Sequence, residues 1–96
     1  MNRDDAIRQL RALLPDVQQR YGVQSLRLFG STARNQAHGD SDLDLLVCFD
    51  GPATAEKYFG TLFVLEDRLG CSIDLVTEDS LRQEFRPYVE RDAIAV

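Results

Sequence analysis

The sequence predicts a mixed α/β fold (α+β), in which helices pack on a small mixed β-sheet. Two observations support this class. Residues 4–21 and 54–69 repeat apolar side chains at the three- and four-residue spacing of an amphipathic helix. Residues 23–29, 43–49 and 71–76 are shorter apolar runs bounded by glycine or by polar turn residues, which is the pattern of β-strands.

The N-terminal stretch has a clear helical pattern. Its apolar residues follow one another at spacings of 3, 4, 3 and 4, at Ile7, Leu10, Leu14, Val17 and Tyr21. Pro15 interrupts the pattern. Because proline is tolerated in a first turn but not in mid-helix, we expect either a kink or a second short helix that starts at Pro15. The helical stretch should end before Gly22.

Two strands and a polar loop should follow. Val23–Phe29 is expected to be the first strand and to end at Gly30-Ser31, and Thr32–Asn35 is expected to form the first turn of a short helix. The backbone N–H groups at the start of such a helix favour phosphate oxygens. Ala37–Ser41 should then lead as a loop into Leu43–Phe49, whose nearly unbroken apolar run is typical of a central strand.

A second long helix is expected over Thr54–Leu69, with Gly70 as its stop. Its apolar face should lie in the core and comprises Phe59, Leu62, Phe63, Leu65 and Leu69. Cys71–Val76 should form a third strand.

The C-terminal region predicts one more helix and a short final segment. Ser80–Gln83 resembles a capping box, and despite Pro87 a helix is favoured by the four-residue spacing of Leu81, Phe85 and Val89. Ala93–Val96 is expected to be either a short edge strand or a frayed end.

Composition and charge exclude several classes. The 96 residues suffice for one domain, and no run reaches the roughly 18 consecutive apolar residues of a membrane span. A net charge of −5 argues against direct binding of nucleic acid or of an anionic membrane. The charged N-terminus lacks the apolar run of a signal peptide, so a cytoplasmic location is expected. Cys48 and Cys71 are expected to be reduced core thiols, and His38 a solvated loop residue.

Two carboxylates, Asp42 and Asp44, open the second strand with one residue between them. Both should project from one face of the strand, while Leu43 and Leu45 turn to the other. Two carboxylates 4 Å apart repel by about 4 kcal/mol at an effective dielectric constant of about 20, so one would protonate in the absence of a cation. A divalent ion would remove this conflict.

A third carboxylate, Asp74, lies in the middle of the third strand between Ile73 and Leu75. Burying an unpaired carboxylate is costly. Asp74 therefore either pairs with an arginine or joins Asp42 and Asp44 as a third ligand, and the residues alone leave both alternatives open.

The complete pattern is a strand, Gly30-Ser31, ten residues, Asp42-x-Asp44 at the start of the next strand, and a third aspartate in a later strand. This pattern resembles the signature of the nucleotidyltransferase superfamily that includes DNA polymerase beta. More narrowly, Gly30-Ser-Thr-Ala-Arg34 and Ser41-Asp-Leu-Asp-Leu-Leu-Val47 are similar to the minimal nucleotidyltransferase (MNT) family. The resemblance covers the chain from about Arg3 to its end.

One position departs from the family pattern. Members often carry glycine directly after the Ala-Arg pair, where this chain has Asn35. Asparagine tolerates a left-handed backbone better than most residues, so the loop can keep its shape.

The resemblance implies a polymerase beta-like nucleotidyltransferase fold, in a single domain over residues 1–96. It also implies that Asp42 and Asp44 hold two Mg²⁺ ions, and that Asp74 ligates the second ion and assists deprotonation of the attacking hydroxyl.

The resemblance assigns ATP-binding roles to three further residues. Gly30 would let the backbone approach the phosphates, and Ser31 would donate a hydrogen bond to the β or γ phosphate. Arg34 would be either a phosphate contact or a structural partner of an aspartate.

The resemblance further implies a biological role. Chains of this kind usually serve as the antitoxin of a two-gene pair, and transfer AMP from ATP to a tyrosine of a HEPN-domain ribonuclease toxin that they also bind. A hetero-oligomer would follow. Two alternatives stay open: a non-catalytic module that masks a toxin, and a nucleotidyltransferase that acts on a small-molecule hydroxyl.

Overall fold

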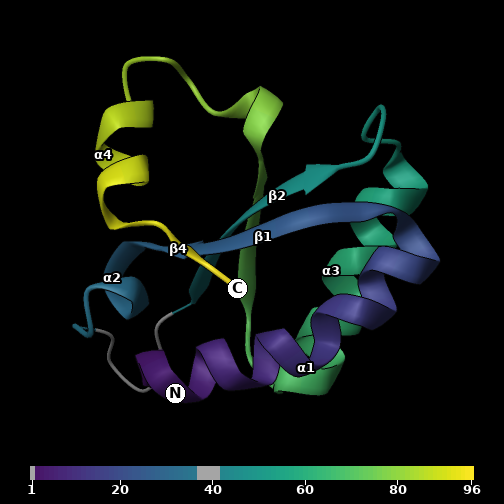
Figure 1. Ribbon diagram of the computed structural model, residues 1–96, viewed down its shortest axis with the longest axis horizontal. Helices are drawn as coiled ribbons and strands as arrows, with labels where there is room; N and C mark the ends of the chain where they lie inside the picture. The colour runs from purple at the N-terminus through teal and green to yellow at the C-terminus, as the bar shows by residue number, and fades with distance from the viewer. Residues whose placement is uncertain (1, 37–41) are drawn as a thin grey trace.

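The computed structural model describes residues 2–36 and 42–96, which form a four-stranded mixed sheet in the order β3-β2-β1-β4 (Figure 1). The strands are β1 (Val23–Phe29), β2 (Leu43–Phe49), β3 (Ile73–Thr77) and β4 (Ile94–Ala95). β1 runs antiparallel to β2 and to β4, whereas β2 and β3 are parallel. The helices are α1 (Arg3–Tyr21), α2 (Gly30–Ala33), α3 (Ala55–Leu69) and α4 (Arg86–Asp92), with a 3₁₀ turn, η1, at Glu78–Ser80. The mixed α/β class is confirmed.

The core lies between one face of the sheet and two long helices. α1 and α3 pack against each other below the sheet, α1 against β1 and α3 against β3 (Figure 1). The strands contribute Leu28 and Leu45, and the helices contribute Leu10 and Leu65, all of them fully buried. Because successive side chains of a strand alternate between faces, Asp44 and Asp74 lie on the opposite face of the sheet, together with the buried Leu46.

Helix α1 is continuous from Arg3 to Tyr21, so the expectation of a second helix starting at Pro15 is wrong. Pro15 leaves the backbone carbonyl four residues earlier, at Arg11, without its usual donor. Both residues are exposed, so water can take that carbonyl. The predicted end is confirmed, because Gly22 caps the helix with a left-handed backbone, φ 70°.

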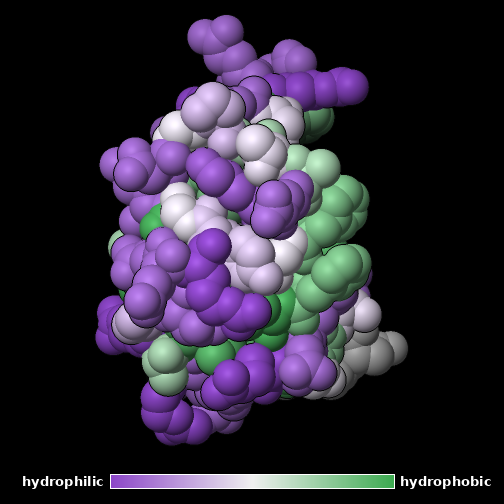
Figure 2. Space-filling view, turned by 90° about the vertical axis from the view of Figure 1, so that its right-hand side faces the viewer, coloured by the Kyte–Doolittle hydropathy of each residue, from purple (hydrophilic) through white to green (hydrophobic). Residues whose placement is uncertain are grey.

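Helix α3 has the predicted extent, with Thr54 as its N-cap and Gly70 as its C-cap, but its apolar face is divided. Thr61, Leu65 and Leu69 are buried, whereas Phe59 and Phe63 are 49% and 61% exposed, so placing these two phenylalanines in the core was wrong. A surface helix buries one stripe, and the two rings lie beside that stripe. Figure 2, turned toward the α3 side of the molecule, shows apolar side chains reaching the surface.

Two predicted boundaries and one prediction of burial are corrected. Helix α2 begins at Gly30, two residues before the expected Thr32. Strand β3 begins at Ile73, two residues after the expected Cys71. Cys48 and Cys71 are free thiols, as expected, but both are half-buried and not core residues.

The C-terminal segment differs most from its prediction. No capping box forms at Ser80. Instead the Thr77 hydroxyl accepts a hydrogen bond from the Ser80 N–H at 3.3 Å and closes η1. Helix α4 starts only at Arg86, because Pro87 fits the first turn of a helix and not its interior. The final residues form β4, so the edge-strand alternative is confirmed.

Some expectations fall outside the described residues. Ala37–Ser41, including His38, belong to this group. Among the residues that are described, no helix combines the length and the apolarity that crossing a membrane requires.

Because only part of the apolar face of α3 is buried, truncating a buried and an exposed side chain of this helix should reduce the stability of the protein by different amounts. Leu65→Ala should reduce the free energy of unfolding by about 2–5 kcal/mol, because it leaves a cavity in the core. Phe63→Ala, two residues away and largely exposed, should cost less than about 1 kcal/mol. Urea denaturation of both variants measures the difference. Equal losses would show that Phe63 is a core residue after all.

Candidate active site

The polar face of the sheet brings two aspartates together. In the parallel pair β2–β3, Asp44 is the register partner of Asp74, and on the other side of Asp44 lies Phe29 of β1. Asp42 precedes β2, is exposed and acts on Asp44 through its charge, while Leu43 and Leu45 are buried in the core. The prediction that Asp44 lies on the face opposite Leu43 and Leu45 is therefore confirmed.

Gly30 lies against the carboxylate of Asp44. Its backbone is left-handed, φ 75°, and a Cβ built on it would overlap the Asp44 carboxylate. Glycine is thus required twice here, once for its backbone conformation and once for the missing side chain. The contact joins the start of α2 to β2, so the turn after β1 is held directly at the aspartates.

The charges at this site are not balanced within the described chain. Burial raises the pKa of the Asp44 carboxyl, and the charges of Asp74 and Asp42 and a side-chain hydrogen bond with Asp74 raise it further, while the charge of Arg34 lowers it. The direction agrees with the repulsion expected from the sequence. The larger cause is burial, however, and Asp74 contributes more than the neighbouring Asp42.

The position of Asp74 bears on the alternatives that the sequence left open. Asp74 is exposed and stands beside Asp44, and within the described residues it forms no ion pair with an arginine. The structure therefore favours Asp74 as a member of the carboxylate group over Asp74 as a structural ion-pair partner.

Arg34 and Ser31 lie on or next to α2. The Arg34 Nη1 atom is 3.1 Å from Asp92 Oδ2 and its Nε donates to Gln36 Oε1 at 3.2 Å, so Arg34 has a structural partner at the end of α4. Ser31 follows Gly30 in the first turn and is half-buried. Asn35 has φ 60°, the left-handed backbone for which asparagine is suited.

The donor set suits a hard divalent cation. Carboxylate oxygens are the ligands that Mg²⁺ prefers, and a cation would offset the repulsion recorded at Asp44. In the described part of the chain, no group of three or more histidine, cysteine, aspartate or glutamate side chains stands arranged as a ligand set. The fit therefore rests on the chemistry of Asp42, Asp44 and Asp74.

Sequence reasoning missed the second wall of the site. Helix α4 and β4 return to the end of β1, which places Tyr88 and Asp92 beside Gly30. Two contacts hold this return: the Arg27 Nη2 atom of β1 lies 2.7 Å from Glu78 Oε1, and Arg86 Nη2 donates a hydrogen bond to the Glu78 backbone carbonyl at 3.0 Å. The Arg27–Glu78 pair joins residues 51 positions apart, so no local sequence pattern indicates it.

Comparison with known proteins agrees with the fold. The family model described as "Nucleotidyltransferase domain" matches residues 10–96. The protein adenylyltransferase MntA of Thermococcus cleftensis is 35% identical over 81 residues, which is 84% of this chain and 82% of the relative.

Solved structures extend the comparison. A minimal nucleotidyltransferase is 36% identical with a TM-score of 0.85, over 100% of this chain and 97% of the other. An MNT antitoxin in complex with a tri-AMPylated HEPN toxin of Shewanella oneidensis has a TM-score of 0.68 at 19% identity, over 97% of this chain and 70% of that one, and shows a shared fold. With the match of the family model over residues 10–96, these similarities establish that the chain belongs to the nucleotidyltransferase domain family.

Proposed function

We propose that this nucleotidyltransferase is a Mg²⁺-dependent protein adenylyltransferase, which transfers AMP from ATP to a tyrosine hydroxyl of a HEPN-domain toxin and thereby neutralises it. The observation that carries the proposal is the register pair Asp44–Asp74, with Gly30 pressed against Asp44 at the start of α2. The similarity to an adenylyltransferase named MntA over most of both chains supports the choice of AMP and of a protein acceptor.

The chain supplies an acidic group and a phosphate-binding turn. Asp42, Asp44 and Asp74 would hold the Mg²⁺ ions, which when bound would neutralise the triphosphate and lower the pKa of the attacking hydroxyl. Gly30 exposes its backbone to the phosphates, and Ser31 would donate a hydrogen bond to one of them. These groups position reactants and balance charge, which is the main requirement of phosphoryl transfer.

The transfer makes one bond and breaks one. The acceptor oxygen bonds to the α-phosphorus of ATP, the bond between that phosphorus and the bridging oxygen to the β-phosphate breaks, and pyrophosphate leaves. The proton of the acceptor hydroxyl must be taken up. Asp74, which is exposed and lies beside Asp44, would receive that proton in the proposed reaction.

The acceptor has to come from outside the chain. Asp42 and Asp74 are both exposed, so the described residues leave the carboxylate group open to a large partner. A structural neighbour is an MNT antitoxin bound to an AMPylated HEPN toxin, which supports a toxin as the acceptor of this chain and a hetero-oligomer as its working form.

Mass spectrometry tests the transfer directly. Incubation of a HEPN-domain toxin with this protein, ATP and Mg²⁺ should add about 329 Da to the toxin per transferred adenylyl group, on tyrosine. The Asp42→Ala, Asp44→Ala double variant should give no addition, while Asp67→Ala, an exposed acid on α3, should act like the unaltered protein. A stable complex without added mass would instead support a masking module.

Substitutions of two glycines distinguish an effect on catalysis from an effect on folding. Gly30→Ala should lower the rate of AMP transfer about 100-fold, because displacement of Asp44 by the new Cβ shifts the reacting groups by about 1 Å. Gly70→Ala is the matched control, since Gly70 has a similar φ of 68° and no atom within 4 Å of its Cβ position. Both variants should lose about 1–2 kcal/mol of stability through backbone strain, measured by thermal unfolding. Equal activities would exclude a catalytic role for the Gly30 contact.

The raised pKa of Asp44 predicts a stability that depends on pH. A folded-state pKa above the unfolded value means that the stabilisation is present at low pH and is lost as the pH rises through the folded pKa. Without Mg²⁺ at neutral pH, Asp44→Asn should therefore raise stability by about 1 kcal/mol, or about 4–8 °C in Tm. The gain should vanish in acid.

Magnesium supplies the control for this measurement. Adding Mg²⁺ should raise the Tm of the unaltered protein more than that of Asp44→Asn. Asp67→Asn, distant on α3, should behave like the unaltered protein in both tests. A lower Tm for Asp44→Asn at neutral pH would mean that the carboxylate stabilises the fold.

A further inference from the structure

A hollow of about 360 Å³ lies between the start of α2 and helix α4. Its lining includes Phe29, Gly30 and Arg34 from the end of β1 and from α2, and Tyr88, Arg91 and Asp92 from α4. Gly30 also touches the Asp44 carboxylate, so the hollow and the acidic group share one residue. A ligand whose phosphates lie at Gly30 can therefore extend directly into the hollow.

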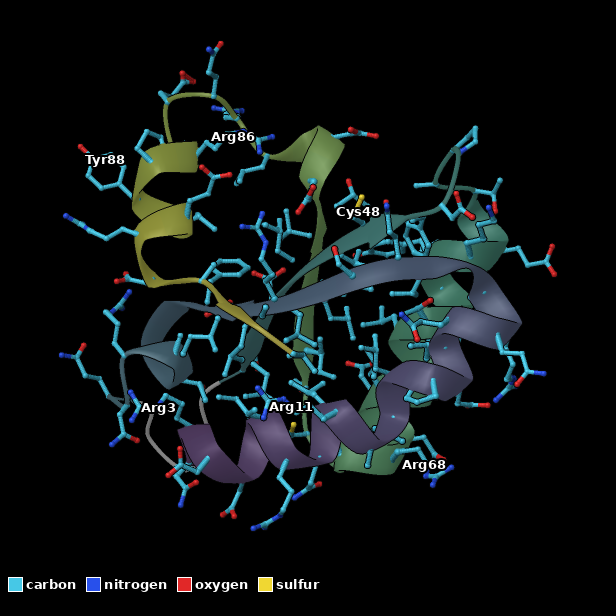
Figure 3. The ribbon with its side chains drawn as sticks, in the orientation of Figure 1. Arg3, Arg11, Cys48, Arg68, Arg86 and Tyr88 are labelled. Atoms are coloured by element: carbon cyan, nitrogen blue, oxygen red, sulfur yellow. The ribbon has the colours of Figure 1, made fainter. Side chains whose placement is uncertain are left out.

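An exposed aromatic ring forms one side of this hollow. Tyr88 is 63% exposed and projects outward from α4, away from the sheet (Figure 3). The Arg91 guanidinium lies 5.7 Å from the ring centroid, so a cation stacks on one face of an aromatic ring that is otherwise largely exposed. Flat π-systems such as nucleobases stack on rings of this kind.

The hollow carries a small excess of positive charge in an acidic chain, because two arginines and one aspartate line it. Two arginines, Arg34 and Arg91, line it, although the chain as a whole carries a net charge of −5. Arg34 is close enough to the acidic group to act on Asp44 electrostatically, while it pairs with Asp92 at 3.1 Å. Cations between an aromatic ring and a phosphate-binding turn suit an anionic ligand with a flat apolar end.

We propose that this hollow binds the nucleoside half of ATP, with the base stacked on Tyr88 and the phosphates directed by Arg34 toward Gly30 and Asp44. The inference rests on the proposed function, because it takes a nucleoside triphosphate as the substrate. It goes further by naming the residue that binds the base, on a helix far from the aspartates in sequence.

Calorimetric titration with two ligands separates base from phosphate binding. Tyr88→Ala should weaken Mg–ATP binding about 5- to 150-fold, the range measured for loss of one stacked base, and should leave Mg–tripolyphosphate binding unchanged. Tyr88→Phe keeps the ring and should bind ATP normally. The matched control is Phe63→Ala, which removes a ring of similar exposure, 61%, on α3, and should change neither affinity.

The other possible results of the titration also test whether Tyr88 binds the base. Unchanged ATP affinity in Tyr88→Ala would overturn the proposal, and would assign the hollow to the acceptor if AMP transfer to the toxin then fell. Equal weakening of ATP and tripolyphosphate binding would also overturn it, because Tyr88 would then act on the phosphate site. Tyr88-dependent ATP binding without AMP transfer to protein would uphold this inference while the proposed function fails.

Discussion

The parallel pairing of β2 with β3 is the constraint on which the rest of the structure depends. It sets Asp44 beside Asp74, although thirty residues and a whole helix separate them along the chain. Parallel neighbours require a crossover connection, and α3 provides it. The helix that covers the core is thus also the element that brings the third carboxylate to the second.

Holding ionised Asp44 at the site costs free energy, and the hydrophobic core on the other face of the sheet offsets this cost. Burial and neighbouring negative charge both disfavour ionised Asp44, yet its neighbours in β2, Leu43 and Leu45, are buried in the core on the other face. The strand therefore cannot slip by one residue, because a slip would exchange the leucines for the aspartates. Hydrophobic burial on one face of the sheet thus holds the carboxylates close together on the other face. A bound cation would offset the repulsion between them.

The C-terminal segment closes the open side of the sheet with polar contacts in place of a second core. Arg27 lies 2.7 Å from Glu78, and Arg34 lies 3.1 Å from Asp92, so η1 and α4 are tied to β1 and α2 through charges. Such partly exposed pairs stabilise weakly, and the rings of Phe85 and Tyr88 stay exposed. This side of the molecule is therefore suited to contact with a ligand or a partner chain.

The sequence by itself determined the nearly unbroken apolar run of β2, the glycine ends of α1 and α3, and the carboxylates Asp42 and Asp44, because each depends on residues close together in the chain. Strand pairing decided that Gly30 lies against Asp44 and that Asp74 lies beside Asp44. It also decided the wall formed by Tyr88 and Arg34, because β4 joins β1 across more than sixty residues. The exposure of Phe59 and Phe63 likewise depended on where α1 packs against α3. An apolar stripe indicates that a helix has a buried side, but it does not indicate how much of that side the neighbouring element covers.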